Sequence, residues 1–324
     1  MPKRKIYFRA DGNTDIGLGH VIRCLALADI LKDDFECVFA TRFVNKYINE
    51  EIEKTCSSYI KLNEHNNQHF EDFLTVIDKE DTVVLDNYFF TTEYQIKIKN
   101  IGCKLVCIDD MHDKHYVADA VINHSPGLTE DQFSVETYTK LCLGLDYALL
   151  RKPFLNVIPR KRTELKRCLI CMGGADKYNI TTNIICLLED VKSIKTIDVI
   201  IGSAFLFKDE LENAIDKSEK EVNIFFNLSS GDMVERMQIA DFGILPASSV
   251  SIEAMAVGMP FMVGYSVSNQ EEFYYNLIRK HSMFGLGNLL NLDSLLINGF
   301  NNKNSSLKKI TSQCLITLFH NYGL

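Results

Sequence analysis

The strongest constraint on the fold is a regular alternation of short apolar runs with helical patterns, which occurs in both halves of the chain. In the first half, the apolar runs are KIYFRA (5–10), FECVFA (35–40), TVVLDNY (82–88), CKLVCIDD (103–110) and ADAVIN (118–123). Helical patterns between them cover His20–Lys32, Phe43–Lys54 and Thr92–Asn100. Because parallel strands need crossover helices, the alternation predicts a parallel sheet with helices on both faces.

The alternation starts again after a charged segment that contains two prolines. Its apolar runs are CLICMGG (168–174), TIDVIIG (196–202), VNIFFN (222–227), DFGILPA (241–247) and PFMVGYS (260–266). The expected helices cover Asn179–Glu189, Asp209–Asp216, Asp232–Ala240, Val250–Val257 and Ser306–Phe319. We therefore predict an α/β protein with two Rossmann-like, doubly wound domains, 1–150 and 167–324, joined by a linker at 151–166. Ligands of such folds bind at the carboxyl ends of the strands, so we expect a cleft between the domains to hold the site.

Composition and charge narrow the class of protein. The chain has 324 residues, 46% of them hydrophobic, and a net charge of −8 with scattered basic residues. Nucleic-acid binding needs a coherent positive surface, so we expect no nucleic-acid partner. No apolar run resembles a signal peptide or a bilayer span, which favours a cytoplasmic protein without a membrane anchor. The ten cysteines then belong to a reducing compartment, and the C-x-x-C of Cys168 and Cys171 reads as a buried strand, not a metal site.

A glycine turn follows the first apolar run, in the stretch DGNTDIGLGHVIRC (11–24). Gly17 and Gly19 allow positive φ and a close approach of the backbone to a ligand. The dinucleotide fingerprint is incomplete, because Ile22 replaces its third glycine and FATR (39–42) lacks the acidic residue that holds a ribose. His20 begins or caps the next helix, either as a general acid or base or as a turn residue.

Polar residues also follow the strands of the second half. Gly173 and Gly174 form a second glycine turn, which is either structural or a phosphate cradle. Ser248 and Ser249 can cap a helix or hold phosphate, and Glu253, one turn further on, can reach a ribose diol. Asn269 and Gln270 stand at another junction between a strand and a helix.

Two further strand ends in the first half carry polar side chains. Asp86 and Tyr88 follow one strand, where the tyrosine either anchors the strand or positions a sugar. The loop IDDMHDKHYVAD (108–119) is a possible metal site, but its spacing matches neither a helical histidine pair nor a calcium loop. We predict no metal.

Together, these motifs resemble the family of UDP-sugar hydrolases of pseudaminic acid biosynthesis, which act on UDP-2,4-diacetamido-2,4,6-trideoxy-β-L-altropyranose. The resemblance rests on FRADGNTDIGLGHVIRCLALADIL, VVLDNY, IDD, LGLDYALLRKPF, CMGGADKYNIT, DFGILPASSVSIEAMAVGMP and SNQ, in this order. It extends to about residue 280. More distantly, the glycine turn and the serine–glutamate helix are similar to MurG-type glycosyltransferases of the GT-B fold.

The resemblance implies a metal-independent enzyme that needs no cofactor and releases UDP by attack of water at the anomeric carbon, with inversion. It places His20 at the water and Tyr88 in the site, while Asp11 would line the sugar pocket. The uridine and diphosphate side falls on Gly173, Gly174, Ser248, Ser249 and Glu253, and a sugar-facing amide falls on Asn269. Asn87, where the family pattern has histidine, and SSVSIEA (248–254) depart from that pattern, so the hexose is open.

Three other functions remain open from the sequence. A GT-B glycosyltransferase would pass the sugar of the same donor to an acceptor. A non-catalytic module would bind UDP without turnover, and an epimerase would interconvert UDP-sugars. We expect a UDP-sugar as the small-molecule partner and a monomer or weak dimer.

Overall fold

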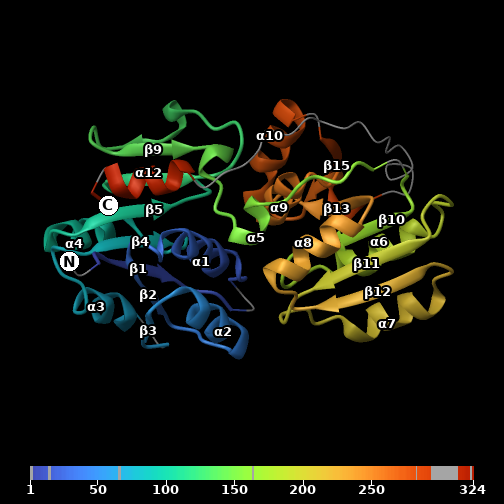
Figure 1. The fold of residues 1–324 in the computed structure, drawn as a ribbon, viewed down its shortest axis with the longest axis horizontal. Helices are drawn as coiled ribbons and strands as arrows, with labels where there is room; N and C mark the ends of the chain where they lie inside the picture. The colour runs from blue at the N-terminus through green and yellow to red at the C-terminus, as the bar shows by residue number, and fades with distance from the viewer. Residues whose placement is uncertain are drawn as a thin grey trace. The chain divides into compact units, whose positions relative to one another are not determined.

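The computed structural model describes residues 3–13, 16–64, 67–162, 164–281, 283–292, 313–321 and 323–324. Two compact units make up the chain (Figure 1). The first comprises Met1–Lys152 together with Ile310–Leu324, and the second comprises Pro153–Lys309. We describe each unit by itself.

The first unit is built on a seven-stranded parallel sheet in the order β3-β2-β1-β4-β5-β7-β9. The strands are β1 (Lys5–Ala10), β2 (Glu36–Thr41), β3 (Ser58–Lys61), β4 (Thr82–Asp86), β5 (Lys104–Ile108), β7 (Ala120–Asn123) and β9 (Lys140–Leu143). The order 3-2-1-4-5 is that of a Rossmann unit, and it reverses direction between β1 and β4. A separate two-stranded ribbon pairs β6 (His115–Tyr116) with β8 (Ser134–Val135).

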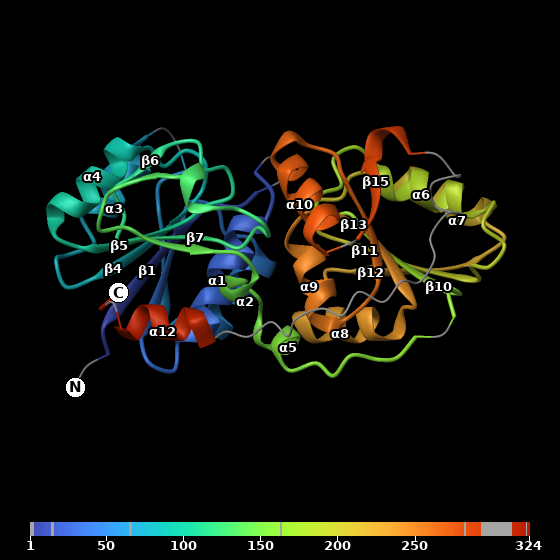
Figure 2. The same ribbon diagram turned by 90° about the horizontal axis from the view of Figure 1, so that it is seen from above.

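Helices cover both faces of this sheet (Figure 2). They are α1 (Gly19–Leu31), α2 (Lys46–Thr55), α3 (Gln68–Leu74) and α4 (Thr92–Ile101), with short 3-10 turns at Glu130–Gln132 and Leu145–Tyr147. Alternate strand residues enter opposite cores: Ile6 and Phe8 join the cluster with α1 and α2, whereas Tyr7 joins the cluster with α3 and α4. The strands are therefore apolar on both faces, as the unbroken apolar runs predict.

The last helix differs from the sequence-based expectation. The structure describes α12 as Gln313–Asn321, and residues 306–312 of the expected helix lie outside the described residues. We expected this helix in the second domain, but Leu315, Leu318 and Phe319 are buried in the core cluster of α1 and α2. The ring of Phe319 lies 6.3 Å from that of Phe35 in an edge-to-face contact. Burial of this apolar face assigns α12 to the first unit.

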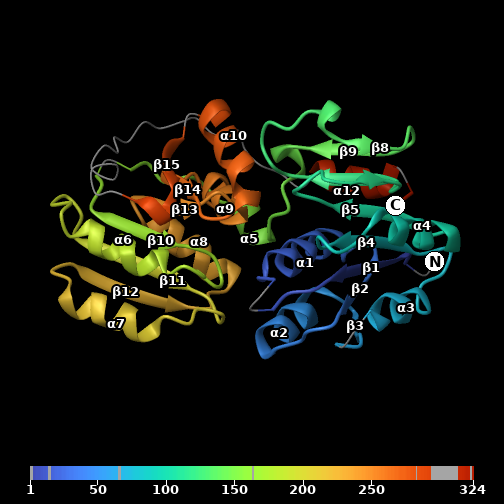
Figure 3. The ribbon, with the colours of Figure 1, turned by 180° about the vertical axis from the view of Figure 1, so that it is seen from behind.

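The second unit repeats the first strand order in a six-stranded parallel sheet, β12-β11-β10-β13-β14-β15 (Figure 3). The strands are β10 (Arg167–Cys171), β11 (Thr196–Ile201), β12 (Glu221–Phe226), β13 (Phe242–Pro246), β14 (Phe261–Tyr265) and β15 (Phe284–Asn288). The helices are α6 (Ile180–Leu188), α7 (Lys208–Lys217), α8 (Ser230–Ile239), α9 (Ser249–Val257) and α10 (Glu271–His281), with 3-10 turns at Ser268–Gln270 and Leu289–Asn291. The strand order of this sheet reverses direction between β10 and β13.

The expected linker, 151–166, contains the short helix α5 (Lys152–Leu155) and a buried arginine. Arg162 donates hydrogen bonds to the carbonyl oxygens of Met237, Ala240 and Gly258, at the ends of α8 and α9. Burial and the nearby charge of Arg160 lower the pKa of Arg162 to about 10. Because the two helix ends present partial negative charge, they stabilise this cation and fix the segment to the second unit.

The packing of α12 predicts the effect of removing one ring. Phe319→Ala should lower the free energy of unfolding of the first unit by about 3 kcal/mol, because the substitution leaves a cavity in a fully buried site. Hydrogen exchange should become faster at β1 amides and stay unchanged at β10 amides. Thr317→Ala, at an exposed position of the same helix, is the control. Equal acceleration in β1 and β10 would contradict the assignment of α12.

Candidate functional site

The glycine turn that leads to α1 lies at the switch point of the first sheet, between the carboxyl ends of β1 and β4. Gly17 has φ +82°, a conformation that favours glycine, and its N–H donates to the carbonyl of Asn13 over 2.8 Å. Gly19, by contrast, is the first residue of α1 and needs no positive φ. Of the two glycines that allow positive φ, Gly17 therefore adopts it and Gly19 does not. The turn brings His20, on the first turn of α1, to the end of β4.

His20 forms a buried pair with Asp86. Its Nδ1 lies 2.7 Å from Asp86 Oδ1, and the two side chains are 6% and 0% exposed. Burial alone would raise the pKa of Asp86, but the charges of Arg23 and His20 outweigh burial and lower it. The carboxylate therefore stays ionised and can hold Nδ1–H, which directs Nε2 of His20 away from the pair.

Arg23 completes the pairing of Asp86. Its Nε and Nη2 donate to the two carboxylate oxygens over 2.5 and 2.6 Å, and its Nη1 donates to Asp110 over 3.0 Å. Asp86, Asp110 and Tyr88 raise the pKa of Arg23 far above its usual value, against the effect of burial. We did not select Arg23 from the sequence. Its place three residues after His20 puts both side chains on one helix face, and that spacing is the signal that could have found it.

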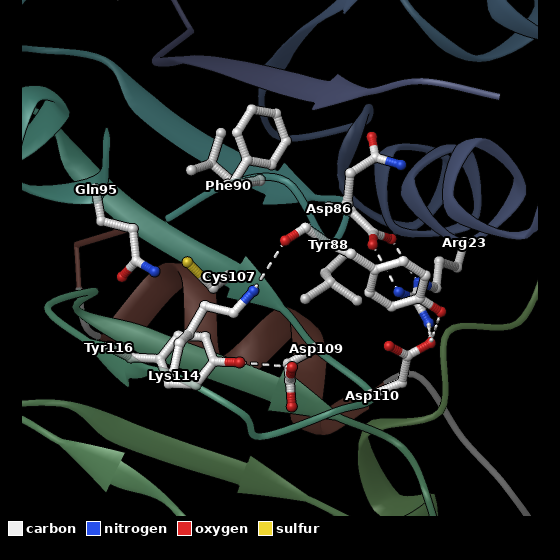
Figure 4. Close-up of a pocket in the computed structure, with 13 residues that line it drawn as sticks. Arg23, Asp86, Tyr88, Phe90, Gln95, Cys107, Asp109, Asp110, Lys114 and Tyr116 are labelled. Atoms are coloured by element: carbon white, nitrogen blue, oxygen red, sulfur yellow. Dashed lines mark hydrogen bonds and ion pairs between the residues drawn. The ribbon is translucent and has the colours of Figure 1, made fainter. Parts of the chain in front are cut away.

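Tyr88 packs against His20. The two rings are edge-to-face, with centroids 4.8 Å apart and planes at 83°. The Tyr88 hydroxyl donates to Asp110 Oδ2 over 3.1 Å (Figure 4). The structure thus brings together the predicted residues His20, Asp86 and Tyr88, and adds Arg23 and Asp110.

A small cavity of about 20 Å³ lies beside this group, between the ends of β4 and β5. Its lining includes Asp86, Tyr88, Asp110, Lys114 and Tyr116 (Figure 4). A space of this size admits about one water molecule. The cavity is therefore too small for a sugar, whereas Tyr88 beside it is 45% exposed.

Asp11 occupies a different position from the one that we expected. Its carboxylate is 0% exposed and accepts hydrogen bonds from Arg9, Arg42 and Thr41 over 2.7–3.1 Å. Burial opposes ionisation, but the bonds and charges of the two arginines lower the pKa of Asp11 from 3.8 to about 2. Because its oxygens are satisfied inside the protein, Asp11 is a structural ion-pair centre and not a direct sugar contact.

Asn87 links the ends of β1 and β4. Ala10 pairs with Asp86 in the sheet, so the next residues, Asp11 and Asn87, lie side by side. The N–H of Asp11 donates to Asn87 Oδ1 over 2.7 Å, and Asn87 Nδ2 donates to the Asp11 carbonyl over 3.2 Å. This amide is therefore fixed to the backbone at the switch point.

The acidic loop 108–119 distributes its side chains among separate partners. Asp109 accepts from Tyr116 and Asn123, Asp110 binds Arg23 and Tyr88, and His115 contacts Ser134 and Glu136. Within the described ranges, no group of three His, Cys, Asp or Glu side chains has a geometry that could hold a metal ion. Asp109, Asp110 and His115 are therefore each held by partners within the first unit.

In the second unit, the glycine turn is followed by Asp176, a residue that the sequence did not single out. Gly173 has φ +83°, in the left-handed region, as its position in a turn requires. Asp176 is buried, and its two carboxylate oxygens accept the N–H groups of Ile180 and Thr181 over 2.9 and 2.8 Å. The N-terminus of α6 thus already holds a negative charge from the protein.

The other predicted residues of the second unit lie at the ends of β13 and β14. Ser248 is the N-cap of α9 and Ser249 its first residue, both partly exposed, but the Ser248 side chain makes no capping hydrogen bond. Glu253 is buried one turn further on. Gln270 accepts the N–H of Ser266 over 3.0 Å, so it closes the loop after β14, and Asn269 lies beside it in the 3-10 turn Ser268–Gln270. The predicted residues therefore fall into two groups, one in each unit.

The comparison with protein families gives a match that covers most of the second unit and extends into α12 of the first. The model of the lipid-A-disaccharide synthetase family, LpxB, matches residues 156–321, which is half of the chain. The chain belongs to this family. None of the described helices is long and apolar enough to cross a membrane.

Three curated proteins give similarity over most of the chain. The uncharacterized protein MJ1062 of Methanocaldococcus jannaschii is 29% identical over 86% of this chain, which spans only 59% of that relative's length. The spore coat polysaccharide biosynthesis protein SpsG of Bacillus subtilis is 27% identical, with 81% and 77% of the two chains covered. UDP-2,4-diacetamido-2,4,6-trideoxy-beta-L-altropyranose hydrolase of Campylobacter jejuni is 24% identical, with 82% and 93% covered.

Solved structures show the fold class. MurG of Acinetobacter baumannii has a TM-score of 0.61 at 13% identity, covering 92% of this chain and 89% of its own. A putative UDP-N-acetylglucosamine 2-epimerase from Listeria monocytogenes has a TM-score of 0.63 at 9% identity, covering 99% and 97%. The two Rossmann-like units thus have the GT-B fold, as the sequence predicted.

The buried ion pairs of Asp11 predict a pH-dependent stability. Because the pKa of Asp11 is lower in the folded protein, its ionised form stabilises the fold above pH 3.8, and this contribution disappears as the pH falls to about 2. Asp11→Asn should therefore lower the free energy of unfolding by about 2 kcal/mol at pH 7. The difference from wild type should shrink steadily below pH 4, as measured by urea unfolding followed by circular dichroism.

The control for this measurement is Asp33→Asn, which changes an exposed carboxylate paired with Lys152. A surface pair of this kind contributes at most about 1 kcal/mol. If Asp11→Asn and Asp33→Asn have the same effect at pH 7, Asp11 is not the ion-pair centre of the first unit.

Proposed function

We propose that this protein is a UDP-sugar hydrolase that transfers the sugar to water. The observation that carries the proposal is the buried His20–Asp86 pair, with Tyr88 against the imidazole, at the switch point of the first sheet. Switch points are where ligands of doubly wound sheets bind. The name of the Campylobacter jejuni relative, a UDP-sugar hydrolase, supports the choice of reaction.

In the proposed reaction, a water molecule attacks the anomeric carbon while Nε2 of His20 takes its proton. The new carbon–oxygen bond forms as the bond from the anomeric carbon to the diphosphate oxygen breaks, and its electron pair leaves with UDP. Attack from the face opposite the leaving group inverts the anomeric centre. Asp86 holds the imidazole by Nδ1 and stabilises the imidazolium that forms.

We assign UDP binding to the second unit. Ser248 and Ser249 at the start of α9 would offer N–H and hydroxyl groups to the diphosphate, and Glu253 would bind the ribose. Gly173 and Gly174 would let the backbone approach the nucleotide, and Asn269 and Gln270 would complete this side. Since Asp176 already occupies the N-terminus of α6, we expect the diphosphate at α9.

The proposed substrate is UDP-2,4-diacetamido-2,4,6-trideoxy-β-L-altropyranose, the compound in the name of the Campylobacter jejuni relative. We propose that the enzyme works without a metal or cofactor, as a cytoplasmic monomer or weak dimer. In the first unit, Asp11 would support the sugar pocket indirectly, through the strand ends that it holds.

The second candidate is a GT-B glycosyltransferase that uses the same kind of donor. The matched family model is named for a synthetase, lipid-A-disaccharide synthetase, and the fold is that of MurG. A transferase would place an acceptor hydroxyl where the hydrolase places water. The two functions therefore differ in whether UDP release needs an acceptor.

The first test measures UDP release from UDP-diacetamido-trideoxyhexoses without any acceptor. A hydrolase should release UDP and free sugar in equal amounts, and proton NMR should show the inverted anomer first. Addition of EDTA should leave the rate unchanged. UDP release that begins only after addition of an acceptor sugar or lipid would identify the transferase instead.

The second test replaces the proposed base. His20→Asn should keep the fold and lower kcat by about 10²–10⁴-fold, because a positioned general base contributes a factor of that size. His115→Asn changes a histidine of the β6–β8 ribbon, outside the His20–Asp86 pair, and is the matched control. Wild-type turnover in His20→Asn would exclude the assigned role of His20.

A further inference from the structure

Arg23 joins two carboxylates that come from different strand ends. Arg23 is 6% exposed; its Nε and Nη2 bind Asp86 at the end of β4, and its Nη1 binds Asp110 after β5 (Figure 4). A planar guanidinium holds its partners in a fixed geometry, unlike the flexible ammonium of lysine. The position of Asp110 is therefore set by the same group that holds the partner of His20.

Tyr88 is bonded to Asp110 through its hydroxyl. Its side chain is 45% exposed, and the hydroxyl donates to Asp110 Oδ2 over 3.1 Å. Its backbone carbonyl accepts from Lys114 Nζ over 3.2 Å. A hydrogen bond to an ionised acceptor is roughly twice as strong as one between neutral groups. Asp110 therefore holds the hydroxyl end of a ring whose centroid lies 4.8 Å from that of His20, in an edge-to-face contact.

We propose that Asp110 is a positioning residue, fixed by Arg23, that holds the Tyr88 ring against His20 in the orientation required for attack on the anomeric carbon. The kinetic part of this inference rests on the proposed function. Asp110 touches neither the imidazole nor, in this proposal, the reacting atoms. Arg23, its other partner, lies 3.1 Å from Nδ1 of His20, but the role proposed for Asp110 runs through Tyr88.

The placement explains why a hydrogen bond at the far end of Tyr88 affects the reaction. The ring borders the imidazole, so its orientation decides where water and sugar can sit relative to His20. A misplacement of about 1 Å at such a site can lower a rate by about 10²-fold. Loss of Asp110 should therefore lower kcat and leave KM nearly unchanged, because the nucleotide is bound elsewhere in this proposal.

The first experiment measures the ring contact directly, without substrate. In proton–carbon NMR spectra of protein labelled in its histidine rings, the His20 signals, assigned with His20→Asn, carry a ring-current shift from Tyr88. Tyr88→Ala should remove this shift, and Asp110→Ala should move the signals in the same direction by at least half as much. Asp131→Ala, which changes an exposed carboxylate of the 3-10 turn Glu130–Gln132, is the control and should leave them in place.

The inference is overturned if the His20 signals stay at their wild-type positions in Asp110→Ala while Tyr88→Ala moves them. It is also overturned if Tyr88→Ala does not move them. Asp110→Asn preserves the size of the side chain and replaces Asp110→Ala if the alanine variant unfolds. Because an amide oxygen accepts more weakly than a carboxylate, we expect a smaller shift in the same direction.

The second experiment is a double-mutant cycle in kcat. Asp110→Ala should lower kcat by about 10²-fold with KM within about threefold of wild type. If Asp110 acts through the Tyr88 hydroxyl, the double variant Asp110→Ala/Tyr88→Phe should be no slower than the slower single variant. If the kcat of the double variant falls by the product of the two single-variant factors, Asp110 acts by a route other than the Tyr88 hydroxyl.

The two experiments separate this inference from the proposed function. If the wild-type protein hydrolyses no UDP-sugar, the proposed function fails, and the NMR measurement still decides whether Asp110 positions Tyr88. If the wild-type protein is an active hydrolase and Asp110→Ala retains its kcat, the hydrolase stands and the positioning role is excluded.

Discussion

The candidate site depends on a buried negative charge, the carboxylate of Asp86 at the end of β4. A carboxylate with no exposed surface is costly unless it is fully paired, and here Arg23 and His20 supply the pairing. Both partners come from one face of α1, so the charge fixes the rotation of that helix relative to the sheet. The imidazole, the guanidinium and, through Asp110, the Tyr88 hydroxyl all take their positions from this single carboxylate.

The two sheets share the same order of their first five strands, but different side chains occupy their switch points. In the first unit, Asp11 pairs with the buried Arg9 of β1 and with the partly exposed Arg42, and the polar group with an open side lies at β4 and α1. In the second unit, Asp176 neutralises the start of α6 next to β10, and the partly exposed serines lie at β13 and α9. In each unit, a buried carboxylate, Asp11 or Asp176, follows the first strand in the sequence. The neighbouring strand across the switch point, β4 or β13, carries the polar groups to which we assign the reaction and UDP binding.

The fold could be predicted from the sequence because strands that are buried on both faces are apolar throughout, and the helical patterns between them indicate the crossover helices. The edge strand Ser58–Lys61 escaped prediction, since it is short and largely exposed. His20, Asp86 and Tyr88 could be placed at strand ends by spacing alone. The spacing of Arg23 from His20 indicates a shared helix face, but the role of Arg23 depends on partners sixty or more residues away, which spacing does not show. The burial of Asp11 likewise depends on Arg42, which directly follows another strand, β2.

The return of the last helix to the first unit has a consequence for how the protein is made. Leu315, Leu318 and Phe319 are synthesised after the whole second unit, yet they complete a core that β1 and α1 begin. Domains usually fold in the order of their synthesis. Here the second unit can finish first, while the first unit waits for the apolar residues of α12 with part of its core uncovered. Any truncation that removes α12 would therefore damage the unit that carries His20.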